Sequence, residues 1–176
     1  TYFSSIQLAF AALLLLILAL SEKEGGRSRV VSWLALSIGF LFISADEICG
    51  LHERLNERIR IFLNAEQLGF VYFAWVIPAA ILVLIVGLTF ISFLKGIERP
   101  TRVRFIIAGS MFVGGSLGVE MLAGRYVEIH GGSNLVYMLH TLLEEGLEMC
   151  GVAFFIHALL LYISGEQPRV RIAIRA

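Results

Sequence analysis

Residues 30–58 read VVSWLALSIGFLFISADEICGLHERLNER, and the change of character along this stretch decides how the chain folds. The first part is apolar for long enough to cross a bilayer as a helix, which takes roughly 20 residues. The second part carries Asp46, Glu47, His52 and Glu53. The stretch therefore predicts a membrane-spanning helix with a group of acids and a histidine at its end.

The composition of the whole chain agrees with a membrane protein. The chain has 176 residues, of which 58% are hydrophobic and 16% are charged, and its mean hydropathy is +0.84. Soluble domains are typically about a quarter charged. The net charge is zero and no basic stripe is present, so a nucleic-acid partner is not expected. Two cysteines, Cys49 and Cys150, are too few for a disulfide framework.

The apolar runs predict an all-α, polytopic bundle of five membrane spans that forms a single domain over residues 1–176. The runs are long and continuous, without the polar–apolar alternation of a membrane β-barrel. Pro78 lies inside the third run and is expected to kink that helix. The predicted spans are residues 3–20, 30–50 (continuing as helix to 58), 69–94, 103–124 and 135–164.

The basic residues predict an orientation, because lysine and arginine in short loops favour the cytoplasmic side. Most of the 14 lysines and arginines fall on one side of the predicted bundle. The exceptions are Arg54, Arg58, Arg60 and Arg125. We therefore expect the N-terminus outside and the C-terminus in the cytoplasm, in a bilayer that is most simply a bacterial inner membrane.

Acidic residues from three spans are expected at a similar depth, near the outer boundary of the hydrocarbon. A helix rises about 1.5 Å per residue, which brings Asp46 and Glu47 to the level of Glu120. His140 and Glu144 reach the same level as the last span descends. Within that span His140, Glu144 and Glu148 are spaced four residues apart, so they form one stripe.

Two further patterns concern helix faces. If the second helix continues to residue 58, Asp46, Cys49, Glu53 and Glu57 share one stripe, with Glu47 and His52 on its flanks. In the fourth span, Ser110, Gly114 and Gly118 form a face of small residues, which predicts close packing against another helix, and Gly115 widens this face.

Carboxylates inside a membrane are costly unless a cation, a proton or an arginine compensates them. Carboxylate and imidazole ligands suit iron, manganese or zinc, and we expect iron most readily, with zinc or manganese as alternatives. In ligand type the cluster resembles the di-iron carboxylate proteins, although the chain lacks their Glu-x-x-His motif. The predicted metal ligands are Asp46, Glu47, His52, Glu53, Glu120, His140, Glu144 and Glu148.

Three functions are compatible with these patterns. The leading hypothesis is a membrane-embedded metal-binding protein, in its first form an oxidoreductase with one or two metal ions that acts on a lipid-soluble substrate; zinc-assisted hydrolysis is a less favoured form of it. The second is a non-catalytic accessory subunit of a respiratory or photosynthetic membrane complex. The third is a proton or cation pathway, which ranks lowest because the cytoplasmic halves of the spans carry few polar residues.

The segment between the second and third spans is expected to lie at the membrane surface. Residues 58–68 read RIRIFLNAEQL, and Ile59, Ile61 and Phe62 are placed to enter the headgroup layer. Tyr72, Trp75, Tyr126 and Tyr137 are interpreted as an aromatic belt near the same boundary.

Overall fold

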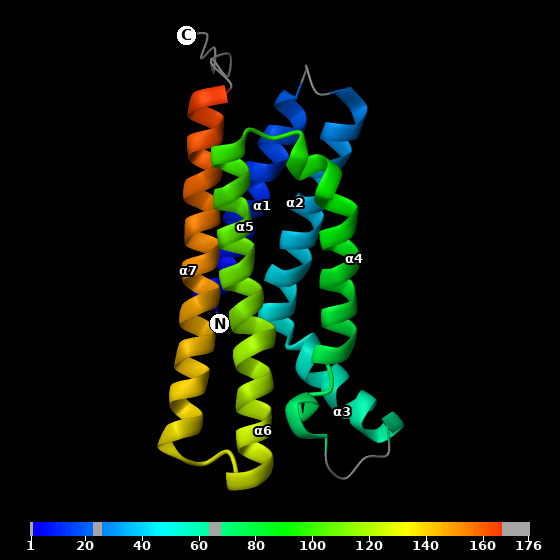
Figure 1. Cartoon of the computed structure of the whole chain (residues 1–176), viewed down its shortest axis with the longest axis vertical. Helices are drawn as coiled ribbons and strands as arrows, with labels where there is room; N and C mark the ends of the chain where they lie inside the picture. The colour runs from blue at the N-terminus through cyan, green and yellow to red at the C-terminus, as the bar shows by residue number, and fades with distance from the viewer. Residues whose placement is uncertain (1, 23–25, 64–67, 167–176) are drawn as a thin grey trace.

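The computed structural model describes residues 2–22, 26–63 and 68–166, and it is an elongated bundle of helices (Figure 1). Across this part of the chain no strand is present. The helices are α1 (Tyr2–Ser21), α2 (Gly26–Cys49), α3 (Leu51–Leu63), the 3-10 turn η1 (Gly69–Val71), α4 (Val76–Lys95), α5 (Arg99–Val113), the π-helical turn η2 (Gly114–Val119), α6 (Glu120–His130) and α7 (Leu135–Glu166).

Five helical segments are long and apolar enough to cross a membrane, as the sequence predicts. They are α1, α2, α4, the continuous segment α5–η2–α6, and α7. Their exposed surface is rich in leucine, isoleucine and valine, which is the expected lipid-facing composition. The all-α class is thus confirmed, and five helices that could cross a membrane lie where the sequence places its five apolar runs.

The second helix does not continue to residue 58. Gly50 adopts a left-handed φ of +58°, and its amide donates to the carbonyl oxygen of Asp46 at 2.7 Å. Glycine reaches this conformation without the steric penalty of a Cβ, so it ends α2 at Cys49 and lets the chain turn into α3. The predicted stripe through Asp46, Cys49, Glu53 and Glu57 is therefore wrong, because its members belong to two different helices.

The third span begins later than the sequence predicts. Residues 69–75 form the 3-10 turn η1 and a further turn, and α4 starts at Val76. Pro78 consequently lies in the first turn of α4, where an amide has no intrahelical partner in any case. The expected kink at Pro78 is therefore wrong.

The hydrophobic core surrounds α1 and one buried tryptophan. Half of the apolar window of α1 is buried, against 6% for α4, because α1 packs against both α2 and α7. Trp33 is 0% exposed, and its ring centroid lies 4.7 Å from that of Phe93 and 5.5 Å from that of Tyr162. Aromatic contacts thus join α2, α4 and α7 near one end of the bundle.

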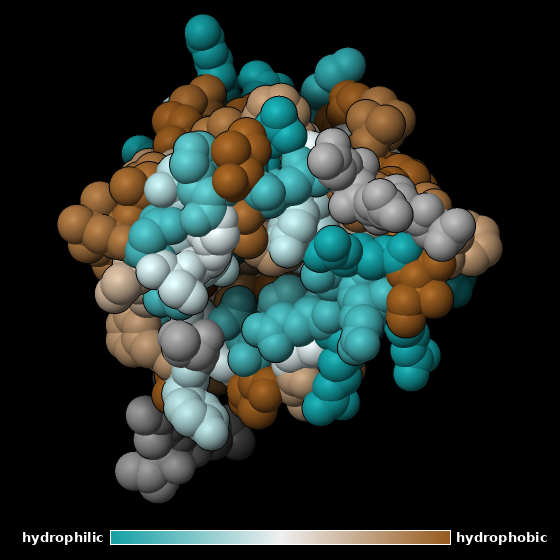
Figure 2. All heavy atoms as spheres, turned by 90° about the horizontal axis from the view of Figure 1, so that it is seen from below, coloured by the Kyte–Doolittle hydropathy of each residue, from teal (hydrophilic) through white to brown (hydrophobic). Residues whose placement is uncertain are grey.

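The opposite end carries α3 and the connection between α6 and α7 (Figure 1). Seen from below, this end presents a broad hydrophilic surface with hydrophobic residues around its edge (Figure 2). The acidic residues of the predicted site lie toward this end.

Candidate functional site

The central feature of the site is the close approach of two carboxyl groups from different helices. Glu120 begins α6 and Glu144 lies in α7, and their carboxyl groups lie close enough for their charges to interact. Glu148 lies one turn along α7, close enough to Glu47, Glu120 and Glu145 for their charges to interact. The structure thus brings together four of the predicted residues, Glu47, Glu120, Glu144 and Glu148, and we call these four the acidic cluster.

The π-helical turn η2 explains how Glu120 reaches α7. Gly115 faces α7 directly, and Glu120 follows it by five residues. In an α-helix residues five apart point about 140° away from each other. A π turn closes hydrogen bonds from i to i+5 and so holds an extra residue, which brings positions five apart onto a similar face. The turn therefore directs Glu120 toward the helix that Gly115 contacts.

The helices approach each other at Gly115 and Gly151. A Cβ on Gly115 would lie 2.8 Å from the carbonyl oxygen of Glu144, and one on Gly151 would lie 2.9 Å from the amide nitrogen of Phe112. Nothing lies within 4 Å of the corresponding positions on Gly114 and Gly118. The predicted Gly114–Gly118 packing face is therefore wrong, and the residue that was expected to widen it makes the contact.

We expect Gly115→Ala to destabilise the protein by about 1–3 kcal/mol, because the added methyl group meets backbone that can move only if α7 shifts. Gly114→Ala is the matched control, since its methyl group enters open space. Unfolding of both variants in mixed micelles, followed by circular dichroism, measures the difference. Equal stability of the two variants would contradict the close approach at Gly115.

Trp75 links the acidic cluster to a second polar group. Its indole Nε1–H donates to Oε1 of Glu120 at 3.2 Å, and its ring lies 5.0 Å from the imidazole of His52. The Nδ1 atom of His52 in turn lies 2.7 Å from Oδ2 of Asp46. The sequence indicated only an interfacial position for Trp75. Its bridging role depends on a partner 45 residues away in the chain, which no local pattern reveals.

Asp46 has a structural role as well as a candidate functional one. Its Oδ1 accepts a hydrogen bond from the backbone N–H of His52 at 3.0 Å, in the first turn of α3. An acidic side chain that accepts from the first turn stabilises a helix start. The same carboxyl group therefore fixes α3 after the Gly50 break and orients the His52 ring.

His140 and Glu53 lie apart from the carboxyl pair. The Nδ1–H of His140 donates to the carbonyl oxygen of Val136 at 2.8 Å, and its ring stacks on Tyr126 at 5.5 Å. Tyr126 also stacks on His130, so these three rings form a group of their own. Glu53 is exposed on α3, where its carboxyl lies near Gly50.

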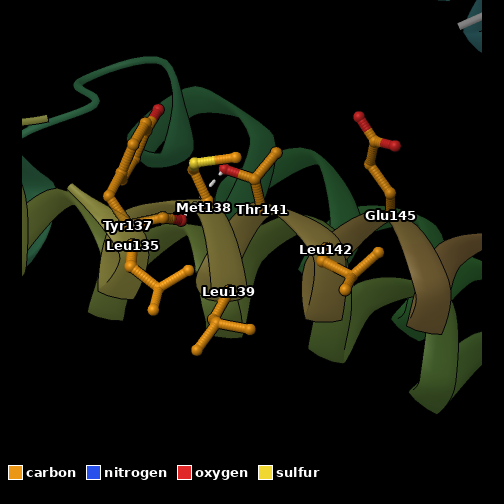
Figure 3. Close-up of a pocket in the computed structure, with 7 residues that line it drawn as sticks. All are labelled: Leu135, Tyr137, Met138, Leu139, Thr141, Leu142 and Glu145. Atoms are coloured by element: carbon orange, nitrogen blue, oxygen red, sulfur yellow. Dashed lines mark hydrogen bonds between the residues drawn. The ribbon is translucent and has the colours of Figure 1, made fainter. Parts of the chain in front are cut away.

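The neighbouring Glu145 faces a surface pocket instead of the centre of the bundle. This pocket is lined by α7 residues, among them Tyr137, Thr141 and Leu142. Figure 3 shows the Glu145 carboxyl pointing away from Leu139 and Leu142. The pocket is open to the outside, and its walls are mainly apolar. It is suited to lipid chains more than to an ion.

The atoms near Glu120 that could bind a metal are carboxylate oxygens, which suit hard or borderline cations. Within residues 2–22, 26–63 and 68–166, no group of three or more histidine, cysteine, aspartate or glutamate side chains is arranged to hold a metal ion. The geometry consists instead of one pair of neighbouring carboxyl groups, one Asp46–His52 pair, and Trp75 between them.

The comparisons with known proteins give a family without an assigned activity. No curated protein and no solved structure matches the chain significantly. A family described as "Domain of unknown function (DUF8692)" matches residues 1–163, and the chain belongs to this family.

Proposed function

We propose that this protein is a membrane-embedded cation-binding protein and that its acidic cluster holds the positively charged species. The observation that carries this proposal is the convergence of the Glu120, Glu144 and Glu148 carboxyl groups from two helices at one place in the bundle. Neighbouring carboxylates repel each other, so a stable arrangement is favoured when they share a proton or bind a cation. The surrounding lipid-exposed helices make the need for compensation greater than in water.

Among the described residues, the ion pairs of Arg29 and Arg125 lie away from Glu120 and Glu144. Arg29 pairs with Glu22, and Arg125 pairs with Glu128 at 2.7 Å. Glu128 also accepts hydrogen bonds from the amides of Leu68 and Gly69, so its role is to hold the segment before η1. Both pairs involve carboxylates outside the acidic cluster.

A divalent metal ion is the first candidate for the bound species, with iron preferred over zinc or manganese. Glu120, Glu144 and Glu148 are the proposed ligands, and Glu47 is the fourth candidate. The ligand oxygens would have to rearrange to admit the ion. A redox-active metal here would suit an oxidoreductase that acts on a lipid-soluble molecule, because the site lies among membrane-spanning helices.

A proton shared between Glu120 and Glu144 is the second candidate, and the closeness of the two carboxyl groups favours it. Binding at one end is proposed, without transit across the membrane. The other end of the bundle is filled by Trp33, Phe105, Leu159 and other buried apolar side chains. Such a core is mainly apolar, which disfavours a continuous polar pathway.

We further propose that the acidic cluster faces the outer side of a bacterial inner membrane. The support is the excess of lysine and arginine at the opposite end of the bundle. The N-terminus is then outside and the C-terminus is in the cytoplasm.

The experiment compares two double variants of the purified protein in detergent. Glu120→Gln with Glu144→Gln removes both charges of the pair and keeps the side-chain volumes. Glu53→Gln with Glu57→Gln is the control, because it removes two exposed charges from α3. We expect bound metal, measured by elemental analysis after incubation with iron, manganese or zinc, to be lost in the first variant and retained in the second.

Infrared spectroscopy of the same samples tests the shared proton. A protonated carboxyl band that is present in the parent and absent from the Glu120→Gln, Glu144→Gln variant would support proton binding without metal. A parent protein with neither stoichiometric metal nor a protonated carboxyl band would overturn the proposed function. Metal that is retained in the Glu120→Gln, Glu144→Gln variant would show that the ion binds elsewhere.

A further inference from the structure

The surface helix α3 is attached to the bundle through polar side chains. The amide of Ala74 donates to Oδ1 of Asn56 at 2.6 Å, and the guanidinium of Arg60 lies 4.3 Å from the centre of the Tyr72 ring. His52, one turn before Asn56, pairs with Asp46. These three α3 residues are spaced four apart, so they form one face, and that polar face points into the protein.

Another side of α3, about 120° around the helix from the polar face, exposes an apolar stripe. Leu51, Leu55 and Phe62 are 41%, 43% and 87% exposed, and their spacing places them on one face of the helix. No described residue of α3 is buried. A surface helix of a soluble protein normally turns its apolar stripe toward the core and its polar side toward water. In α3 this arrangement is reversed, so an apolar medium outside the protein is expected to cover the stripe.

The charged residues of α3 are arranged as expected for a helix at the membrane interface. Arg54 and Arg58 are exposed and lie along one edge of the apolar stripe at helical spacing, and Glu53 and Glu57 lie beyond them, farther from the stripe. Arginine at the boundary of an apolar face can extend its guanidinium to lipid phosphates while its stem stays in the apolar layer. The acids beyond then face water.

The connection to α2 fixes the depth of α3. The helix begins at Leu51, immediately after the membrane-spanning α2 ends at Cys49 and the chain turns at Gly50. Figure 1 shows α3 at the end of the bundle, directed away from the long axis. A helix that begins where such an apolar helix ends is well placed to lie in the headgroup layer.

We propose that α3 is a docking surface for anionic phospholipid headgroups, in which the Leu51, Leu55 and Phe62 side chains enter the acyl boundary and Arg54 and Arg58 bind the phosphates. This surface stands independently of the acidic cluster and of the cation that the cluster binds. Aromatic and aliphatic side chains bury apolar area in the boundary, and the two arginines add a preference for negative lipids.

The test uses the full chain in lipid vesicles, with Cys49→Ser and Cys150→Ser to remove the exposed native thiols. An environment-sensitive fluorophore is attached to a single cysteine at Phe62→Cys or at Glu57→Cys. We expect lipids with brominated acyl chains to quench the probe at position 62 much more than the probe at position 57. Strong quenching by aqueous iodide at both positions, with little quenching by brominated lipid, would overturn the proposal and leave a protein partner as the occupant.

The headgroup preference is measured with Leu55→Cys in the same background, which leaves both arginines and Phe62 in place. Replacing phosphatidylcholine vesicles with vesicles that contain phosphatidylglycerol should increase quenching of the probe by brominated lipid. Arg54→Gln with Arg58→Gln should remove most of this increase. Arg102→Gln with Arg104→Gln removes the same charge at the other end of the bundle and should leave the increase unchanged. An equal response to both lipid compositions in the parent would overturn the recognition of anionic headgroups.

Discussion

Insertion of one alanine after Ser116 is expected to abolish the close approach of Glu120 to Glu144, whereas deletion of Ser116 is expected to preserve it. The π turn already holds one residue more than an α-helical turn. Deletion leaves Gly115 and Glu120 four residues apart in a regular α-helix, about 40° from one another. Insertion adds a residue that the turn has no room for, and it rotates α6 by about 100° relative to α5.

A pair of cysteines reports this change directly. Glu120→Cys and Glu144→Cys are combined with Cys49→Ser and Cys150→Ser, and a short bifunctional thiol reagent is added to the protein in membranes. We expect efficient intramolecular cross-linking in the parent pair and in the deletion variant, and a loss of at least about ten-fold in the insertion variant, since that rotation points the side chain away from α7. Circular dichroism and gel filtration establish that each variant is folded.

Two results would contradict the role of the π turn. Cross-linking that survives the insertion would show that Glu120 reaches α7 without the help of η2. Cross-linking that is lost on deletion would show that the direction of Glu120 relative to Gly115 does not decide whether Glu120 reaches α7. Both readouts are independent of metal or proton binding, so they separate the geometry of the site from its proposed function.

Trp33→Ala is expected to have the largest effect on stability, about 3–5 kcal/mol. The ring is fully buried and contacts aromatic residues of α4, α5 and α7. Its Nε1–H also donates to Oε2 of Glu22 at 3.3 Å. The substitution leaves a cavity and removes the packing of three helices around one side chain, and in lipid such packing is a main source of helix association.

Unfolding of Trp33→Ala in mixed micelles, followed by circular dichroism, measures this loss. Trp33→Phe keeps part of the aromatic packing and removes the indole donor, so we expect an intermediate value. Ile85→Ala, at a residue of α4 that is 56% exposed, should change the free energy of unfolding by less than about 0.5 kcal/mol. A Trp33→Ala variant as stable as Ile85→Ala would rule out the aromatic group as the centre of the core.

The sequence predicts the spans well because each depends on a long local run of apolar residues. It predicts the stripe of Glu144 and Glu148 for the same reason, since α7 is one continuous helix. Gly50 is a local sign that α2 ends, because glycine commonly ends a helix in the left-handed conformation. The helical spacing of the acids on either side of Gly50 favoured a continuous helix instead. The amphipathic character of residues 58–63 could equally be predicted from the sequence.

The unpredicted parts depend on contacts between distant segments. A π turn adds one residue and has no fixed residue pattern, so the direction of Glu120 could not be read from its spacing. Trp75 meets Glu120, and Gly151 meets Phe112, only after the helices have packed. His140 belongs to the predicted stripe, yet its own helix supplies a carbonyl partner and Tyr126 supplies a stacking partner.

The central position of α1 has a consequence for how the chain is assembled during synthesis. During synthesis α1 leaves the ribosome before both of its main partners, α2, which follows at once, and α7, which follows much later. The nascent protein therefore holds its most deeply packed helix in the bilayer with one flank uncovered until α7 has been translated. Any factor that shields polar or small-residue faces of newly inserted helices would act on α1 throughout that interval.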